Sequence, residues 1–202
     1  MTILIIIITS AISIYAFSNR ALFVQLQFNP YQTWHRREWY RFLSHGLLHA
    51  NWTHLIVNMF VLFSFGGSIE SAFRFMCQVT WFKFPIFGYL VFYLLALILS
   101  SITTLRKHKN NSWYNSVGAS GAISAVLFCS IFFNPNMTLL FMGIIPIKAY
   151  IFGPLYLLYS WYAARNVKDN INHDAHLYGA VFGFCFPLLI DIRLIQVFIN
   201  QF

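Results

Sequence analysis

Charged residues are confined to short segments of this chain, and long apolar stretches lie between them. A helix of about 20 apolar residues crosses a bilayer, and a shorter one suffices when it is tilted or flanked by interfacial residues. Asp, Glu, Lys and Arg are absent from residues 1–19, 84–105, 110–147, 149–164 and 175–190. Together with the apolar segment 52–69, this pattern predicts six membrane-spanning helices, at about residues 2–17, 52–69, 85–102, 117–133, 148–164 and 174–191.

The longest uncharged stretch, residues 110–147, is too long to be one span. Asn134-Pro135-Asn136 is a turn-forming cluster that would end a helix, and we expect residues 137–147 after it to form a re-entrant or interfacial loop. The predicted fold class is all-α: a polytopic membrane bundle of six transmembrane helices, in which residues 1–202 form a single membrane domain with no separate soluble domain. A signal peptide over residues 1–17 is the alternative for the first span, but no Lys or Arg precedes the apolar run and no convincing small-residue cleavage site follows it.

Composition also indicates a membrane protein. The chain is 59% hydrophobic and 9% charged, whereas soluble domains carry roughly 25% charged residues. The formal net charge of +8 would suit a nucleic-acid partner, but the basic residues lie in short loops beside Trp and Tyr, as in residues 31–45, YQTWHRREWYRFLSH. That arrangement is typical of contact with lipid headgroups, so we expect the lipid bilayer as a partner and no nucleic acid. The odd number of cysteines favours buried free thiols over disulfides; they are Cys77, Cys129 and Cys185.

Polar residues within the apolar segments are the candidates for chemistry, because a polar group at membrane depth is costly unless it is paired or faces water. His54 and Asn58 are four residues apart, so they project from one face of the second predicted span. A second group, His173, Asp174 and His176, opens the sixth span.

A serine between glycines can be paired with one of these histidines. If successive helices run antiparallel, the second, fourth and sixth spans begin on the same side of the membrane, and His54, Ser120 and His176 lie at similar depth. A hydrogen bond between His176 and the short side chain of Ser120 requires two helix backbones to come unusually close. Small residues at four-residue spacing on both helices allow this; they are Gly121 and Ala125 on one, and Ala175, Gly179 and Gly183 on the other.

Four motifs in this order resemble the rhomboid family of intramembrane serine proteases: HANWTHLIVN (49–58), GGSIE (66–70), GASG (118–121) and AHLYG (175–179). The resemblance covers the chain from about Arg41 to Phe186. It implies a catalytic dyad of Ser120 as nucleophile and His176 as general base, and an oxyanion hole formed by His54, Asn58 and the backbone N–H of Ser120. It also implies supporting roles for a second set, namely His49, Gly118, Gly121 and the loop-anchoring carboxylate of Glu70.

The expected function is therefore that of an intramembrane serine endopeptidase that cleaves peptide bonds in or near transmembrane segments, without a cofactor. Its expected partners are transmembrane protein substrates, and its expected location is the bacterial cytoplasmic (inner) membrane, as a multi-pass protein. Chemistry is compatible with this interpretation, because a histidine titrates near neutrality and can take the proton of an attacking serine. Many family members carry a tyrosine four residues after the nucleophile, where this chain has Ser124. Ser124 or Tyr114 are candidates to hold His176 in its place.

Two other functions fit parts of the sequence. The spacings His45/His49 and His173/His176 suit metal ligands, which suggests a metal-dependent membrane hydroxylase or protease, although no H-E-x-x-H motif is present. A catalytically inactive rhomboid-like protein that binds membrane proteins is the other alternative, and the presence of both members of the dyad argues against it.

Two arguments about membrane orientation disagree. The resemblance places loops 18–50, 103–116 and 165–173 outside the cytoplasm with the amino terminus inside. These loops hold nine of the thirteen Lys and Arg residues, and the rule that positive loops stay in the cytoplasm would reverse this topology. We favour the orientation implied by the family.

Overall fold

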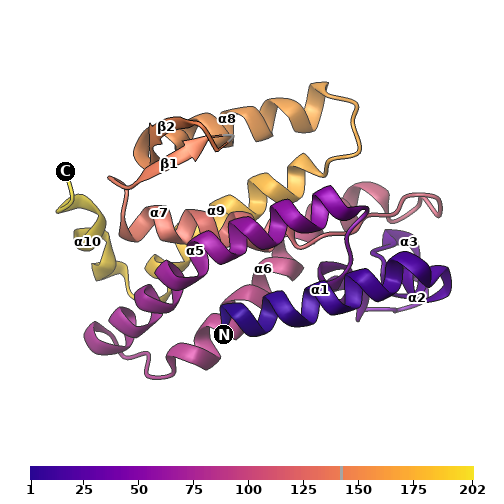
Figure 1. Ribbon diagram of the computed structural model, residues 1–202, viewed down its shortest axis with the longest axis horizontal. Coiled ribbons are helices and arrows are strands. Elements are labelled where there is room, and N and C mark those ends of the chain that lie inside the picture. The colour runs from indigo at the N-terminus through magenta and orange to yellow at the C-terminus, as the bar shows by residue number, and fades with distance from the viewer. Residues whose placement is uncertain (142) are drawn as a thin grey trace.

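The computed structural model describes residues 1–141 and 143–202, and most of them are helical. Six long helices lie close to the six predicted spans (Figure 1); they are α1 (Thr2–Ser18), α5 (Trp52–Val79), α6 (Pro85–His108), α7 (Ser120–Phe133), α8 (Ala149–Asn166) and α9 (His173–Ile190). Short helices lie in the connection between α1 and α5 and at the carboxyl end; they are α2 (Arg20–Leu26), α3 (Pro30–His35), α4 (Arg41–Ser44), η1 (His45–Leu47), η2 (Ile192–Leu194) and α10 (Ile195–Ile199).

Several of these helices begin where side-chain amides satisfy their free backbone N–H groups. Asn51 accepts a hydrogen bond from the backbone N–H of His54 at the start of α5, and Asn172 accepts one from Ala175 at the start of α9. Asparagine is among the preferred residues at this position. Helix α6 begins at Pro85, a residue that suits the first turn because its missing N–H would have no partner there.

The number of membrane spans is smaller by strict criteria than the six predicted. Among the described residues, two helices, α5 and α6, are long and apolar enough to cross a membrane, and a third candidate is the pair α9 with Ile192–Ile199, which is bent by 115°. Helices α1 and α7 are apolar but have only 17 and 14 residues. The structure therefore supports a helical membrane protein without confirming six spans.

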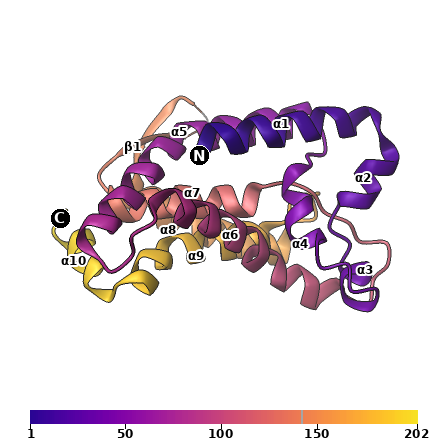
Figure 2. The same cartoon turned by 90° about the horizontal axis from the view of Figure 1, so that it is seen from below.

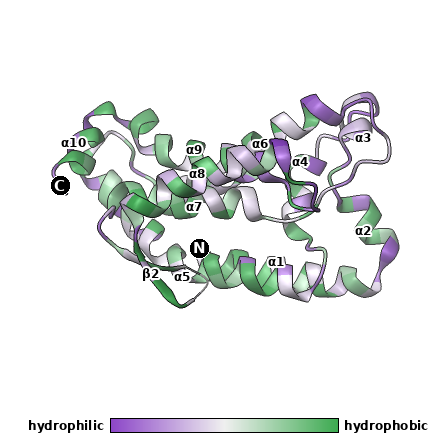
Figure 3. Ribbon diagram, turned by 90° about the horizontal axis from the view of Figure 1, so that it is seen from above, coloured by the Kyte–Doolittle hydropathy of each residue, from purple (hydrophilic) through white to green (hydrophobic). Residues whose placement is uncertain are grey.

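Helix α7 lies at the centre, with α5, α6 and α9 packed around it (Figure 2). Twelve of its fourteen residues are buried, from Gly121 to Phe132. Helices α5, α7 and α9 all start at the same end of the molecule, as predicted (Figure 1). Hydrophilic residues gather at that end, around α3 and the last turns of α6 (Figure 3).

Two strands form a β-hairpin in the segment that was predicted to be a re-entrant or interfacial loop. Strands β1 (Thr138–Phe141) and β2 (Ile145–Lys148) pair antiparallel, with Thr138 opposite Lys148. Met142 lies outside the described residues. The chain is thus not purely α-helical: Pro135 ends α7, and the β-branched and apolar residues that follow form a strand pair in which backbone groups satisfy each other.

The cysteines are free, as predicted, but not all are buried. Cys129 is buried inside α7, Cys77 is half-buried and Cys185 is exposed on α9. In a membrane helix an exposed thiol faces lipid or a neighbouring protein, so the apolar sequence around Cys185 did not indicate burial within this chain.

Candidate active site

Helices α7 and α9 meet backbone to backbone. A Cβ atom added to Gly179 would lie 2.0 Å from the carbonyl oxygen of Gly121, and one added to Gly183 would lie 2.1 Å from that of Ala125. These distances are far below any van der Waals contact, so only glycine fits at both positions of α9. Ser120 precedes Gly121, and His176 lies three residues before Gly179, so both members of the predicted dyad flank this contact.

Ser120 is the first residue of α7 and is half-buried. It lines a small cavity of about 20 Å³, together with His45, Ser101, Gly118, Asn172 and Ala175. A cavity of this size holds about one water molecule when polar groups line it. As the first residue of α7, Ser120 also has a backbone N–H without an acceptor inside the helix.

His176 lies near this cavity without a direct bond to the serine. Among the described residues, the hydroxyl of Ser120 and the ring of His176 form no hydrogen bond. Catalytic hydrogen bonds are often long without substrate and shorten when it binds. The ring of His176 instead packs edge-to-face against that of His173, with centroids 6.1 Å apart and an interplanar angle of 82°.

Gly118, two residues before Ser120, has a backbone conformation and surroundings that only glycine tolerates. Its φ is +120°, and an added Cβ would lie 2.7 Å from His54 Cε1, 2.9 Å from His54 Nε2 and 3.9 Å from Asn58 Nδ2. His54 and Asn58 therefore come together from α5 at the turn that leads into Ser120. The structure places these predicted site residues side by side.

The polar atoms of this pair are suited to donate hydrogen bonds. The backbone N–H of Ala50 donates to His54 Nδ1 over 3.4 Å. In the neutral ring this leaves the proton on Nε2, the nitrogen near Gly118. Asn58 Nδ2 is buried and has no hydrogen-bond partner within the part of the chain that the structure describes. A buried donor without a partner is costly and calls for an explanation; an oxygen that carries negative charge during a reaction would provide its acceptor.

His49 supports His54 from behind. Its side chain is fully buried, and burial together with the neighbouring His54 lowers the pKa of His49 to about 3, so the ring is neutral near pH 7. The hydroxyl of Ser13 in α1 donates to the carbonyl oxygen of Leu47 over 2.7 Å, so Ser13 Oγ accepts from His49 Nδ1 over 3.0 Å. The rings of His49 and His54 stand edge-to-face, with centroids 4.9 Å apart, which limits the rotation of His54.

Glu70 is not part of this site. It lies sixteen residues after His54 on α5, about 24 Å along the helix axis. It accepts a hydrogen bond of 2.8 Å from the backbone N–H of Thr2, and so attaches the first turn of α1 to α5. The predicted contact was with a loop, whereas the observed partner is a helix N-terminus, where a carboxylate is favoured.

Among the described residues, neither candidate replacement for the family tyrosine forms a hydrogen bond or a ring contact with His176. Ser124 and the hydroxyl of Tyr156 on α8 form a hydrogen bond of 2.8 Å. Tyr114 stacks on His108, with ring centroids 3.8 Å apart. The ring that packs against His176 is that of His173, which the sequence indicated as part of a polar group and as one half of a possible pair of metal ligands.

Sequence reasoning missed three contributors: Ser13, Tyr156 and Asp169. Ser13 gave a signal, since it is a polar residue inside an apolar helix. Asp169 Oδ2 lies 3.1 Å from His173 Nε2, and its four-residue separation from His173 was also visible in the sequence. Tyr156 gave no signal, because it is one of many aromatic residues on α8.

The histidines that suggested a metal site have other partners. His45 lies close to the carbonyl oxygen of Arg41 and to Ser101, and His173 pairs with Asp169. Among residues 1–141 and 143–202, no three His, Cys, Asp or Glu residues come close enough to hold one ion.

Comparison with known proteins agrees with this architecture. The sequence model of the Rhomboid domain matches residues 36–192. The chain is 28% identical over 142 residues to the RHOMBOID-like protein 12, mitochondrial, of Arabidopsis thaliana, a match that covers 68% of the chain and 42% of that protein. It is 28% identical over 160 residues to the Rhomboid-like protein 11, chloroplastic, of the same plant, covering 72% of the chain and 50% of the relative.

These matches define a class of membrane proteins, the rhomboid-like proteins. The chain belongs to the rhomboid family. It spans half or less of the length of the two curated relatives that it matches.

Proposed function

We propose that the protein is an intramembrane serine endopeptidase, with Ser120 as nucleophile and His176 as general base. The observation that carries this proposal is the unpartnered, buried Nδ2 of Asn58, which lies beside His54 Nε2 at the turn leading into Ser120. We propose that three donors serve one oxyanion: His54 Nε2–H and Asn58 Nδ2–H, which meet beside Gly118, and the backbone N–H of Ser120 two residues further on. Such preorganised donors stabilise the oxyanion of acyl transfer, and the loss of one costs roughly 3–4 kcal/mol in a well-studied protease.

The reaction then proceeds by acyl transfer. Ser120 Oγ attacks the carbonyl carbon of the scissile peptide bond while its proton passes to His176, and the carbonyl oxygen becomes the oxyanion. The C–N bond breaks as His176 returns the proton to the leaving amine. A water molecule attacks the resulting ester, its proton passes to His176, and the acid product leaves with Ser120 regenerated. The cavity beside Ser120 has room for that water.

The proposed substrates are transmembrane segments of other proteins. A substrate helix would enter laterally and unwind near its end, because a peptide bond must lose its helical hydrogen bonds to reach Ser120. We further propose that the six long helices form one membrane domain spanning the bilayer six times, with short spans tilted. The bacterial cytoplasmic membrane stays a prediction, and the printed names of the two relatives, one mitochondrial and one chloroplastic, do not favour it.

Cleavage by the purified protein in liposomes tests the proposal, with a panel of single-span proteins as substrates and mass spectrometry of the products. Ser120→Ala and His176→Ala should each abolish cleavage while the protein stays folded, and Asn58→Ala should reduce it less. Reaction with a fluorophosphonate probe should label Ser120. Full activity of Ser120→Ala would overturn the assignment.

The same assay separates the two alternatives. An inactive, substrate-binding rhomboid-like protein would capture single-span proteins without cleaving them or reacting with the probe. A metal-dependent enzyme would lose activity with a chelator and keep it in Ser120→Ala. Reporter fusions at Phe202 would decide the membrane orientation.

A further inference from the structure

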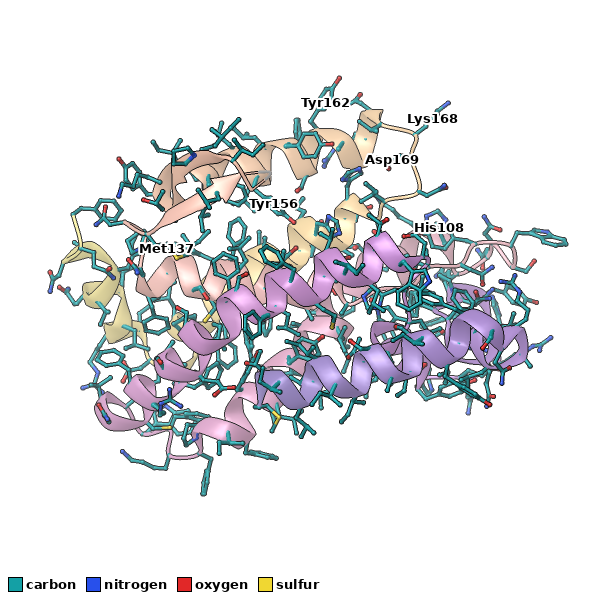
Figure 4. All side chains as sticks on the ribbon, in the orientation of Figure 1. His108, Met137, Tyr156, Tyr162, Lys168 and Asp169 are labelled. Atoms are coloured by element: carbon teal, nitrogen blue, oxygen red, sulfur yellow. The ribbon has the colours of Figure 1, made fainter. Side chains whose placement is uncertain are left out.

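Three titratable side chains form a chain of contacts around the start of α9. They are Asp169, just before the helix, and His173 and His176 within it. Asp169 Oδ2 is 3.1 Å from His173 Nε2, and the ring of His173 stands edge-to-face with that of His176. The three-residue spacing of the two histidines puts both rings on one face of the helix. Figure 4 shows Asp169 in the connection between α8 and α9.

His173 is held on more than one side. It is only 5% exposed, and the ring of Tyr159 on α8 meets it edge-on with centroids 5.8 Å apart. Asp169 is fixed in turn, because its Oδ1 accepts a hydrogen bond of 3.0 Å from the backbone N–H of Ile171. That bond, together with the interaction with His173, keeps the pKa of Asp169 below its ordinary value, so the carboxylate is ionised at neutral pH.

The net charge of the Asp169 and His173 pair affects how easily a neighbouring general base takes up a proton. When His173 is neutral, its Nε2–H donates to the carboxylate and the pair carries one negative charge. A general base of the proposed protease becomes an imidazolium while Ser120 attacks, and a negative charge nearby favours that charged form. No carboxylate among the described residues forms a hydrogen bond with His176 itself.

We propose that Asp169 and His173 are positioning residues for His176: the His173 ring restricts the orientation of the His176 ring, and the Asp169 carboxylate fixes His173 and stabilises the imidazolium. This inference rests on the proposed function. Many family members have a tyrosine on the helix of the nucleophile that stacks against the catalytic histidine. In this chain His173 would take that role, and it lies one turn before His176 on α9.

Among the described residues, the charged or titratable groups that act electrostatically on His176 are His54 of α5, His173 and Asp169. Asp174 lies two residues from His176, hence on roughly the opposite side of α9, and pairs with Lys107 of α6.

The experiment distinguishes the effect of the Asp169 charge on His176 from its effect on the position of His173. Asp169→Asn keeps an oxygen that can accept from His173 but removes the charge. We expect kcat at pH 7 to fall on the order of fivefold with KM unchanged, and the acid limb of the pH profile of kcat to move to lower pH by roughly half a unit, because the imidazolium is less stable without the carboxylate. Asp169→Glu, which keeps the charge, should restore most of the rate. His173→Ala should lower kcat further, on the order of tenfold.

Asp191→Asn is the matched control, since it makes the same change at the other end of α9, where Asp191 pairs with Arg193. It should leave kcat and the pH profile unaltered. The pH dependence of fluorophosphonate labelling of Ser120 gives a second, substrate-free measurement, in which Asp169→Asn should show the same shift.

The outcomes are distinct. If the wild-type protein cleaves substrate but Asp169→Asn keeps both its rate and its profile, the inference is wrong and the proposed function stands. If Asp169→Asn and Asp169→Glu lose activity equally, with no shift of the profile, the pair is merely structural and the inference is again wrong. If the wild-type protein neither cleaves nor reacts with the probe, the proposed function itself fails.

Discussion

Helices α9 and α8 both neighbour α7, but α9 packs tightly against it and α8 packs loosely. Helix α9 touches α7 through glycine, with no side chain between the backbones at Gly121 and Gly179. Helix α8 has only four buried residues out of eighteen, and α7 and α8 are linked by the hydrogen bond between Ser124 and Tyr156. Its outer face carries exposed aromatic residues such as Tyr162, which points away from the other helices (Figure 4).

In the proposed protease, this contrast would separate two requirements of an enzyme that acts on helices. The dyad residues flank the α7 and α9 contact, where the backbone positions are fixed by steric exclusion and a shift of 1 Å could cost about 100-fold in rate. The loosely held wall, α8, is the one that a substrate could displace at low cost. In the proposed protease, α7 and α9 would therefore fix the dyad and α8 would move for the substrate, although α8 also contacts the fixed side where the ring of Tyr159 meets that of His173.

The largest effect should follow from a change in the tight contact. Gly179→Ala places a methyl group 2.0 Å from a backbone carbonyl oxygen, so α9 must move away from α7. We expect cleavage to fall by about 100-fold or more and the free energy of unfolding to fall by about 1–3 kcal/mol. Thermal unfolding in detergent and the liposome cleavage assay measure both.

Gly67→Ala is the matched control for that variant. Nothing lies within 4 Å of a Cβ added at Gly67 in α5, and alanine in a helix is more stable than glycine by roughly 0.5–1 kcal/mol. This variant should be fully active. Equal losses in the two variants would mean that the contact between α7 and α9 does not place the dyad.

A second, smaller effect concerns the pH dependence of the free energy of unfolding, to which His45 beside the Ser120 cavity contributes. Burial lowers the pKa of His45, beside the Ser120 cavity, to about 4. Since the unfolded chain binds a proton below pH 6.5 and the folded protein does not, stability is fully present above that pH and is lost as the pH falls from 6.5 towards 4, by up to about 3 kcal/mol. Thermal unfolding between pH 8 and pH 4.5 should show this slope.

His45→Gln keeps a donor and an acceptor but does not titrate in this range. Its unfolding should depend less steeply on pH, with the remaining slope due to other buried histidines such as His49. A slope identical to that of the wild-type protein would mean that His45 is accessible to protons in the folded state.

The third effect tests whether α8 is held only weakly against α7. Replacing both Ser124 with Ala and Tyr156 with Phe removes the hydrogen bond between α7 and α8, which contributes about 1 kcal/mol. If α8 must move for a substrate to enter, kcat/KM for a transmembrane substrate should rise up to about fivefold. The rate of fluorophosphonate labelling, which needs no helix entry, should stay the same. A drop in both rates would assign α8 to the rigid part of the site.

The smallest effect belongs to the exposed ion pair of Lys107 with Asp174. Lys107→Gln should change the free energy of unfolding by less than about 1 kcal/mol, because exposed pairs lose most of their attraction to solvent. Chemical denaturation with and without 0.5 M salt would detect a larger contribution, which would place this pair with the rigid elements.

The sequence was enough to predict those parts of the fold for which a local pattern is compatible with one structure. Uncharged segments located all six long helices, and small residues at four-residue spacing located the contact between α7 and α9. It failed where the outcome depends on partners distant in the chain. Helix α5 continues past Glu70 to Val79, and the carboxylate that had indicated the end of the span accepts a hydrogen bond from the backbone N–H of Thr2.

The partner of Ser124 is a tyrosine on another helix, and no spacing rule indicates which of the aromatic residues of α8 faces inward. The hairpin of β1 and β2 likewise depends on pairing between two short segments, which an apolar pattern of this length does not distinguish from a loop. The three-residue spacing of His173 and His176 indicated that the two rings share a face of α9, but not that His173 would take the place in which many relatives have a tyrosine.

The bond between Ser13 and His49 has a consequence for how this protein can be shortened. Ser13 belongs to α1, which precedes the matched residues 36–192. A version trimmed to the shared region would leave the imidazole of His49 in an apolar environment with neither of its nitrogens satisfied, and with it the only brace observed behind His54. The region that matches the Rhomboid domain, residues 36–192, therefore omits a side chain that holds His49 in place.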